Sequence, residues 1–253
     1  MLVAAVDTAT LTLSCALVEL RPGALPELLC DRTDRSAAPG VGPSGGHGAR
    51  LPGALQDLLV AVGKTLPDVE GYAVGLGPGS FTGLRIGLAT WKGLAYANRR
   101  PIAGASSLAA MALGAAAEAG EGAVLVPLLD AKKGEVYAGF YRVAAGTVEA
   151  VLPEAALSPA ALLERIGALP AGTAARAFGE GYEAHAAALD GRLPRLAAGA
   201  ATPHAFQVAR LAAPRLAEGP FDAQALFALE PHYVRLSEAE VKFPGGIGPG
   251  AER

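Results

Sequence analysis

Residues 77–87 read Gly-Pro-Gly-Ser-Phe-Thr-Gly-Leu-Arg-Ile-Gly, and they join a short strand predicted over 71–76 to a long helix predicted over 81–98. A strand, a glycine-rich turn and a helix in this order leave free backbone N–H groups that can hold an anion. The turn lacks the Gly-Lys-Ser/Thr of a P-loop and is not a GxGxxG motif within a βαβ unit. Two interpretations stay open: a phosphate loop, or a tight turn whose glycines permit close packing.

Three glycines inside the helix that follows strengthen the case for a close contact. Gly83, Gly87 and Gly93 each cost about 1 kcal/mol of helix stability relative to alanine, so some contact must offset that cost. One stripe of the helix holds Gly83, Gly87, Thr90 and Leu94, and the opposite face, which we predict to be core, holds Leu84, Leu88, Trp91 and Ala95. The glycine stripe faces either the protein's own sheet or another subunit.

Outward from this helix, strands and helices alternate along most of the chain. Strands are predicted over 2–6, 11–20, 25–30, 71–76, 102–105, 123–129, 135–143 and 173–178, and the main helices over 51–62, 81–98, 107–119, 158–167 and 202–217. Two halves that each begin with paired strands predict an α/β fold of two related lobes.

Composition narrows the class of protein. Apolar residues make up 51% of the 253 residues and the net charge is −3, which argues against a protein that holds nucleic acid by itself but leaves a local basic patch open. Cys15 and Cys30 form no metal motif, and a reducing cytosol fits them best. Because Asp7 interrupts the first apolar run and residues 101–117 are too short and polar to span a bilayer, we predict a cytoplasmic protein with no membrane segment.

Few residues suggest catalysis. Asp7-Thr8-Ala9-Thr10 joins two predicted strands and resembles the first phosphate hairpin of actin-like ATPases, although a solvated turn aspartate is the plainer interpretation. The four histidines, His47, His185, His204 and His232, include no pair three or four residues apart, so no helical metal-binding pair is predicted. The GxSxG elbow of serine hydrolases is absent. No catalytic residue and no metal site are therefore predicted.

Three runs occur in order at family spacing: MLVAAVDTATLTLSCALVE from Met1, VGLGPGSFTGLRIGLATWKGLAYANRRPIAGASSLAAMA from Val74, and LLDAKKGEVYAGFYR from Leu128. Together they resemble the TsaB (YeaZ) family of bacterial tRNA-modification subunits. The resemblance covers about residues 1–143, and 77–87 is its most specific part. Residues 178–181 and 231–235 match more loosely.

The resemblance implies a two-lobed actin/Hsp70/sugar-kinase-like (ribonuclease H-like) fold and a non-catalytic scaffold. Such a subunit binds and stabilises the catalytic protein TsaD, with the ATPase TsaE in the larger complex. The complex transfers a threonylcarbamoyl group to N6 of adenosine 37 in tRNAs that read ANN codons, and tRNA is engaged only through it. In TsaD two histidines four residues apart hold the metal, whereas Ser107 and Met111 stand at the matching positions here.

The resemblance also assigns surfaces. The partner interface is predicted on the helices over 51–62 and 83–96, through Leu51, Leu55, Leu58, Gly83, Arg85, Gly87, Thr90 and Leu94, and the same surface would form a homodimer when the chain is alone. A possible vestigial nucleotide site comprises Asp7, Thr8, Gly77, Gly79 and Ser80. Weak nucleotide binding stays open there, and no cofactor is expected. The loop Ser36–Gly48 and the C-terminal tail receive no role.

The boundary between the lobes is predicted near Ala105, with the first lobe over 1–104 and the second over 105–201. The helix over about 202–218 is predicted to pack back on the first lobe, and 219–253 to form a C-terminal segment and tail. Two other functions stay open. One is a stand-alone actin-fold ATPase or kinase, which Asp7 and the 77–79 turn favour mildly. The other is a glycoprotease-like metallopeptidase, against which the missing histidine pair argues.

Overall fold

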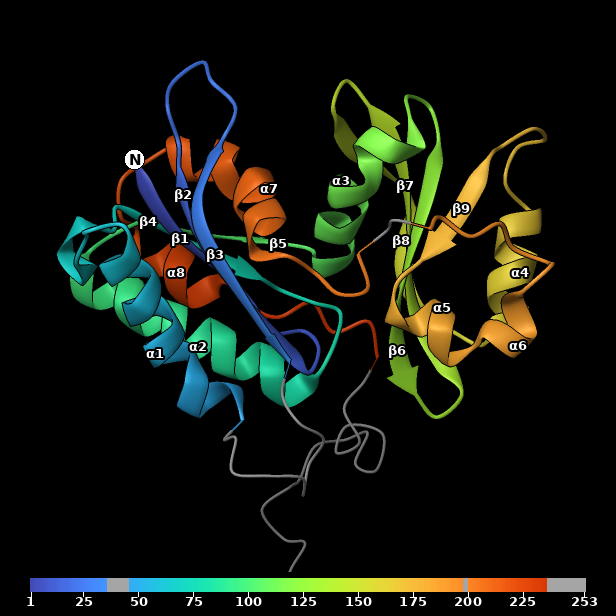
Figure 1. Ribbon diagram of the computed structural model, residues 1–253, viewed down its shortest axis with the longest axis horizontal. Helices are drawn as coiled ribbons and strands as arrows, with labels where there is room; N and C mark the ends of the chain where they lie inside the picture. Colours follow the sequence, from blue (N-terminus) through green and yellow to red (C-terminus); the bar gives the residue numbers. More distant parts are fainter. Residues whose placement is uncertain (36–45, 198–199, 236–253) are drawn as a thin grey trace, which may run out of the picture.

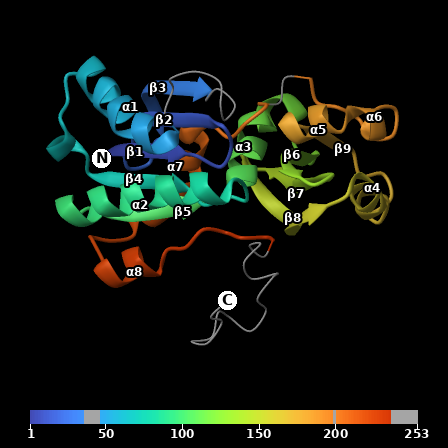
Figure 2. The ribbon, with the colours of Figure 1, turned by 90° about the horizontal axis from the view of Figure 1, so that it is seen from below.

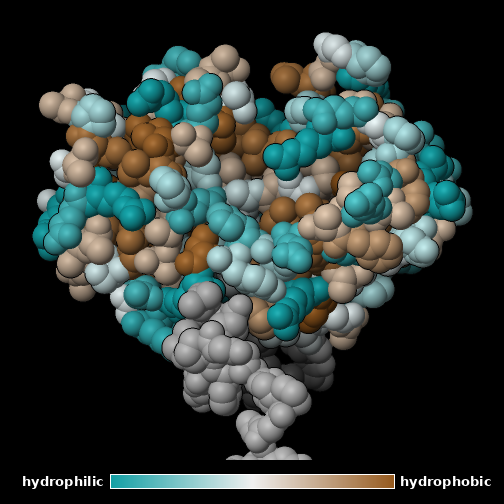
Figure 3. Space-filling view, turned by 180° about the vertical axis from the view of Figure 1, so that it is seen from behind, coloured by the Kyte–Doolittle hydropathy of each residue, from teal (hydrophilic) through white to brown (hydrophobic). Residues whose placement is uncertain are grey.

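The computed structural model describes residues 1–35, 46–197 and 200–235. Two lobes lie side by side, each built on one sheet with helices on both faces (Figure 1). In the space-filling view from behind, a notch separates the lobes at their upper end (Figure 3).

The first lobe has a five-stranded sheet in the order β3-β2-β1-β4-β5. Its strands are β1 (Leu2–Asp7), β2 (Thr12–Glu19), β3 (Glu27–Arg35), β4 (Gly71–Gly75) and β5 (Ile102–Ala105). Strands β1 to β3 form an antiparallel meander, whereas β4 and β5 run parallel to β1.

The second lobe repeats this arrangement with one strand fewer, in the order β8-β7-β6-β9. Its strands are β6 (Val124–Lys132), β7 (Glu135–Ala144), β8 (Thr147–Leu157) and β9 (Ala175–Phe178). Strand β6 is antiparallel to β7 and parallel to β9, as β1 is to β2 and β4. A single parallel bridge between Ala177 and Arg195 stands where a fifth strand would lie. The repeated topology confirms the predicted α/β fold of two related lobes.

Helices sandwich the first sheet because β1 is apolar on both faces. Helices α1 (His47–Ala61) and α2 (Phe81–Asn98) cover one face and α7 (Ala205–Ala217) covers the other (Figures 1 and 2). Ala4 and Val6 pack toward the first pair, whereas Val3 and Ala5 pack toward α7. The chain therefore returns to the first lobe after completing the second.

The second sheet is covered in the same way. Helix α3 (Ser107–Ala119) packs on β6 to β8 and also touches α7. The opposite face holds α4 (Pro159–Gly167), α5 (Glu180–Ala184) and α6 (Ala186–Leu189), which contribute Leu162, Tyr182 and Leu189 to its core. A short 3-10 turn, η1 (Leu66–Asp68), precedes β4.

The C-terminal segment links the lobes. Helix α8 (Ala223–Ala228) packs against α2, and the chain then crosses to the second lobe. The backbone N–H of His232 donates to the carbonyl of Leu76 at 2.7 Å, and Arg235 Nη1 donates to the carbonyl of Ala131 at 2.9 Å. Residues 231–235 thus bind both lobes.

Several element bounds differ from those predicted. Strand β3 extends to Arg35, and α1 begins at His47 rather than Leu51. Neither β8 nor α8 was predicted. Strand β8 is a half-buried edge strand that contains Pro153, and proline fits a strand only at a sheet edge or a bulge. Helix α8 spans only six residues. Most of the loop Ser36–Gly48, and the tail from Phe243, lie outside the described residues. Within the described ranges, no helix has both the length and the apolarity needed to cross a membrane.

Candidate functional site

Asp7 ends β1 as a buried carboxylate that is only 1% exposed. Its Oδ2 accepts a hydrogen bond from Ser107 Oγ at 2.6 Å, and its Oδ1 accepts one from the backbone N–H of Ala9 at 2.8 Å. Burial raises the pKa of Asp7 to about 6, against the opposing effect of these hydrogen bonds. The interpretation of Asp7 as a solvated turn residue is therefore wrong.

Gly75, the last residue of β4, packs on this carboxylate, and the glycine-rich turn packs on the neighbouring Ala9. A Cβ atom added at Gly75 would overlap Asp7 Oδ2, and one added at Gly79 would overlap the carbonyl of Ala9. The backbone N–H of Ser80 donates to that same carbonyl at 2.6 Å, and the N–H of Gly77 donates to Ser107 Oγ at 3.2 Å. The N–H groups of Gly77, Ser80 and Gly83 are thus bonded to the chain itself, which favours the tight-turn interpretation over the phosphate loop.

The glycine stripe of α2 faces the chain's own β1–β2 turn. Gly83 and Gly87 are buried, and a Cβ atom added at either would lie within 2.3 Å of an oxygen of Thr8: the backbone carbonyl for Gly83 and Oγ1 for Gly87. Thr8 Oγ1 donates to the carbonyl of Gly83 at 2.8 Å. The prediction that the stripe meets another subunit is wrong for Gly83 and Gly87, because the chain segment that approaches them is the protein's own. Gly93, by contrast, is exposed, and an added Cβ meets nothing within 4 Å.

A second polar cluster lies between the lobes and was not predicted. Glu154, whose side chain is 8% exposed, accepts hydrogen bonds from Ser106 Oγ and Tyr141 Oη, and its other oxygen lies 2.9 Å from His232 Nδ1. The bond to Glu154 raises the pKa of His232, and burial raises the pKa of Tyr141. These groups come from α3's N-cap, two strands and the C-terminal segment. The sequence offered only a faint signal for them, the matching segment 231–235.

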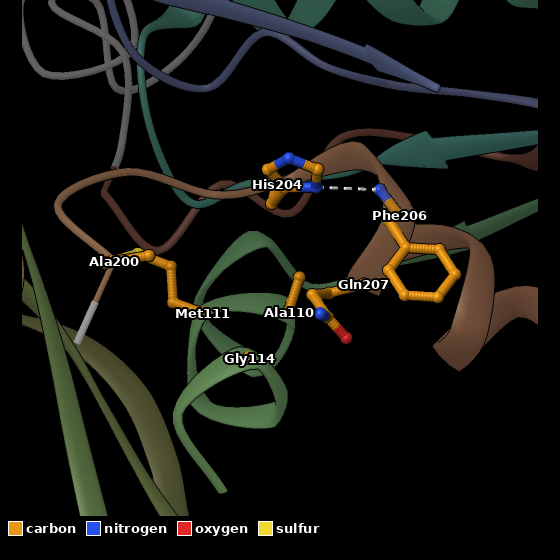
Figure 4. Close-up of a pocket in the computed structure, with 7 residues that line it drawn as sticks. All are labelled: Ala110, Met111, Gly114, Ala200, His204, Phe206 and Gln207. Atoms are coloured by element: carbon orange, nitrogen blue, oxygen red, sulfur yellow. Dashed lines mark hydrogen bonds between the residues drawn. The ribbon is translucent and has the colours of Figure 1, made fainter. Parts of the chain in front are cut away.

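A small hollow of about 200 Å³ opens between α3 and the start of α7 (Figure 4). Its lining is mostly small or apolar, from Ala110, Met111 and Gly114 on one side and Ala200, His204, Phe206 and Gln207 on the other. His204 is held there by Asp31, whose carboxylate lies 3.0 Å from Nε2. The hollow does not include Asp7 or any residue of the glycine-rich turn.

Comparisons with known proteins place the chain in a family. A family model described as "TsaD: tRNA N6-adenosine threonylcarbamoyltransferase" matches residues 35–243. The chain is 36% identical over 206 residues to the tRNA threonylcarbamoyladenosine biosynthesis protein TsaB of Escherichia coli K12. The aligned region covers 79% of this chain and 85% of that protein. The chain belongs to the TsaB (YeaZ) family. YeaZ from Pseudomonas aeruginosa, a solved structure, superposes with a TM-score of 0.70 at 30% identity, over 92% of this chain and 99% of that one.

In this TsaB-family chain, the two residues that the resemblance aligns with the histidines of TsaD have structural partners. Ser107 is fully buried and donates to Asp7, and Met111, one helical turn later, packs into the core between α3 and the second sheet. A hydroxyl bonded to a carboxylate and a buried thioether are poor ligands for the metals that imidazole binds. Among the described residues, no three His, Cys, Asp or Glu side chains gather closely enough to hold a metal ion.

The residues predicted for the TsaB partner interface have different surroundings. Leu51, Leu55 and Leu58 are at most 5% exposed and belong to the core of the first lobe. Gly83 and Gly87 are also buried. These five residues are therefore not available at the surface, because the leucines face the core of the lobe and the two glycines face Thr8. Thr90 and Leu94 are half-buried and Arg85 is exposed, so only these three of the predicted set remain at the surface.

Proposed function

We propose that this chain serves tRNA threonylcarbamoyladenosine biosynthesis as a non-catalytic subunit that binds and stabilises a TsaD-type transferase. The observation that carries this proposal is the closed surroundings of Asp7. Its two oxygens are bonded to Ser107 and Ala9, and the backbone of Gly75 at the end of β4 packs directly on it. A carboxylate in this state lacks the access to solvent and substrate that metal–nucleotide chemistry needs.

The proposal includes the rest of the assembly that the family resemblance implies. The chain needs no cofactor of its own, the TsaE ATPase joins the larger complex, and tRNA is engaged within that complex. Alone, the chain forms a homodimer through the surface that otherwise meets the transferase, because two homologous lobes can present similar surfaces.

The outer surface of α1 and α2 supports a helical interface at a different set of residues from those predicted. Gly53, Ala89 and Gly93 are exposed, and the space around Gly53 and Gly93 is open. Small outward residues on two adjacent helices let a second pair of helices approach closely, as ridges fit into grooves. We place the partner contact on this outer surface, flanked by Thr90 and Leu94.

The test is to mix the purified chain with the TsaD-type transferase of the same organism and follow the complex by analytical ultracentrifugation. We expect a heterodimer, and we expect Gly93→Glu to weaken it at least tenfold. Gly167→Glu, at an equally open glycine on α4 in the second lobe, is the matched control and should bind normally. Circular dichroism confirms that both variants fold.

Activity separates this proposal from the alternatives. With threonylcarbamoyl-adenylate and tRNA, the modified adenosine should form with the transferase and the chain together, and not with the chain alone. Steady ATP hydrolysis by the chain alone would favour the actin-fold ATPase or kinase instead. Peptide cleavage by the chain alone would favour the metallopeptidase.

A further inference from the structure

A row of basic and aromatic side chains follows one side of α2. Phe81, Arg85, Lys92, Tyr96 and Arg99 fall within an arc of about 60° at 3.6 residues per turn. The three cations are seven residues apart, so they repeat about every 10 Å along the helix. This side of α2 faces α8 and the C-terminal segment (Figure 2), and we call these residues, with Phe221, Phe227 and Tyr233 from that segment, the basic aromatic row.

At the N-terminal end of the row, Arg85 lies over the ring of Phe81 and is hydrogen-bonded to the hydroxyl of Tyr233. Its guanidinium carbon lies 3.7 Å from the centroid of the Phe81 ring, and its Nε donates to Tyr233 Oη at 3.2 Å. The two rings are 4.9 Å apart, and they are 38% and 40% exposed. Within the described ranges Arg85 forms no ion pair, so its outer N–H groups are oriented by the rings without a carboxylate of the chain to neutralise them.

The other end of the row repeats this pattern. Lys92 Nζ donates to the carbonyl of Phe227 at 3.0 Å, the rings of Tyr96 and Phe227 lie 5.5 Å apart, and Arg99 lies 5.4 Å from the ring of Phe221. Phe227 is 63% exposed and Tyr96 is 53% exposed. Exposed rings that gather in a patch mark an interaction surface, and here they alternate with cations.

Local charge differs from that of the whole chain. Residues 71–117 contain four cations and no aspartate or glutamate, although the net charge of the chain is −3. The nearest acids in sequence on the neighbouring segment are Glu218, Asp222 and Glu230, and Asp222 is occupied as the N-cap of α8. In the part of the chain that the structure describes, none of these acids pairs with Arg85, Lys92 or Arg99.

We propose that the basic aromatic row binds RNA, with phosphates at the three cations and unpaired bases stacked on the exposed rings. Cations in a line with rings between them fit single-stranded or loop RNA, whose phosphates and splayed bases are bound in this way. Three cations that pair with no carboxylate in the part of the chain that the structure describes favour a polyanionic ligand over a neutral protein surface. The choice of tRNA as the ligand rests on the proposed function, and the row would hold the tRNA while the transferase acts on it.

The experiment measures binding of a fluorescently labelled tRNA that reads an ANN codon to the complex of this chain with its transferase, by anisotropy across a salt series. The test variant is Arg85→Gln/Lys92→Gln/Arg99→Gln. The matched control is Arg165→Gln/Arg176→Gln/Arg192→Gln, three surface cations of the second lobe, of which Arg165 is half-buried and the other two are exposed. We expect the test variant to bind about tenfold more weakly and to lower the slope of log K against log salt by about 2, at roughly 0.7 per lost phosphate contact. Phe227→Ala should weaken binding about tenfold without changing the slope, because stacking releases no counterions.

Ultracentrifugation of the same variants with the transferase, without RNA, separates the two proposals. If the test variant binds tRNA with the affinity and salt slope of the control, the RNA proposal is overturned. If it instead loses the transferase, the row is a protein interface and the RNA proposal is again overturned, while the proposed function stands. Failure of the unchanged chain to bind the transferase would overturn the proposed function alone.

Discussion

Replacing Gly87 by alanine should destabilise the first lobe, and the same change at Gly93 should stabilise it. Both residues lie in α2, where alanine gains about 1 kcal/mol of helix propensity over glycine. The new Cβ at Gly93 meets nothing within 4 Å, whereas at Gly87 it would lie 2.3 Å from Thr8 Oγ1. Because the propensity gain is common to both variants, their difference isolates the cost of overpacking, about 1–3 kcal/mol.

Urea denaturation followed by Trp91 fluorescence measures this difference. Trp91 is the one tryptophan and is fully buried in the first lobe, so its signal reports that lobe. In thermal denaturation, a difference of about 2 kcal/mol corresponds to roughly 4–8 °C between the two midpoints for a chain of this size.

Thr8→Ala provides an internal rescue. It removes the Oγ1 atom that the new methyl group would meet, and it costs about 1 kcal/mol for the lost hydrogen bond to Gly83. In that background Gly87→Ala should become neutral or stabilising. Gly83→Ala should not be rescued, because its Cβ would meet the backbone carbonyl of Thr8, which every residue carries. Equal midpoints for Gly87→Ala and Gly93→Ala would refute the packing of α2 on the turn and return the glycine stripe to the surface.

Three further predictions concern ionisable groups. The folded pKa of Asp7, about 6, lies above its unfolded value, so the carboxyl destabilises the fold as pH rises from about 4 through 6. Asp7→Asn should therefore raise the free energy of unfolding by about 3 kcal/mol at pH 8 and by little at pH 4. An equal difference between variant and unchanged chain at the two pH values would contradict this. The hydrogen bond to Glu154 raises the pKa of His232, so this contact stabilises the fold fully below pH 6.5 and its contribution is lost as pH rises through the folded pKa. Amide hydrogen exchange of residues 231–235 should become faster over that pH interval, and His232→Ala should remove this pH dependence. Burial raises the pKa of Cys15 to about 12, so a thiol reagent at pH 8 should leave Cys15 unmodified in the native protein and modify it in urea. Mass analysis of the peptides measures this, and rapid labelling of Cys15 in the native protein would contradict its burial.

Local chemistry predicted most of the elements correctly. Ser80, Ser106 and Ser158 each cap a helix through the side-chain hydroxyl, so those helix starts follow from residues within three positions of one another. Alternating apolar residues likewise identified both strand pairs that open the lobes. Signals of this kind survive in the sequence because the interacting groups are adjacent along the chain.

The candidate site was predicted only in part. Asp7, Thr8 and the glycine-rich turn do come together, as their place in the resemblance implied. Their state depends on Ser107, which approaches Asp7 from 100 residues away, and no local pattern marks such a donor. The cluster around Glu154 was missed for the same reason, since its partners come from separate segments of the chain.

The sequence by itself determined that α2 has a buried apolar face and that a close neighbour would offset the cost of Gly83 and Gly87, because helical periodicity and the cost of glycine are local properties. The same reasoning failed at Gly93, which has no neighbour within 4 Å. Only the tertiary structure decided which neighbour that is. Glycine carries no side chain whose polarity could mark its surroundings as core, turn or partner. The carbonyl and hydroxyl of Thr8 reach Gly83 and Gly87 only after β1 and α2 pack against each other, and that contact joins residues about 75 positions apart.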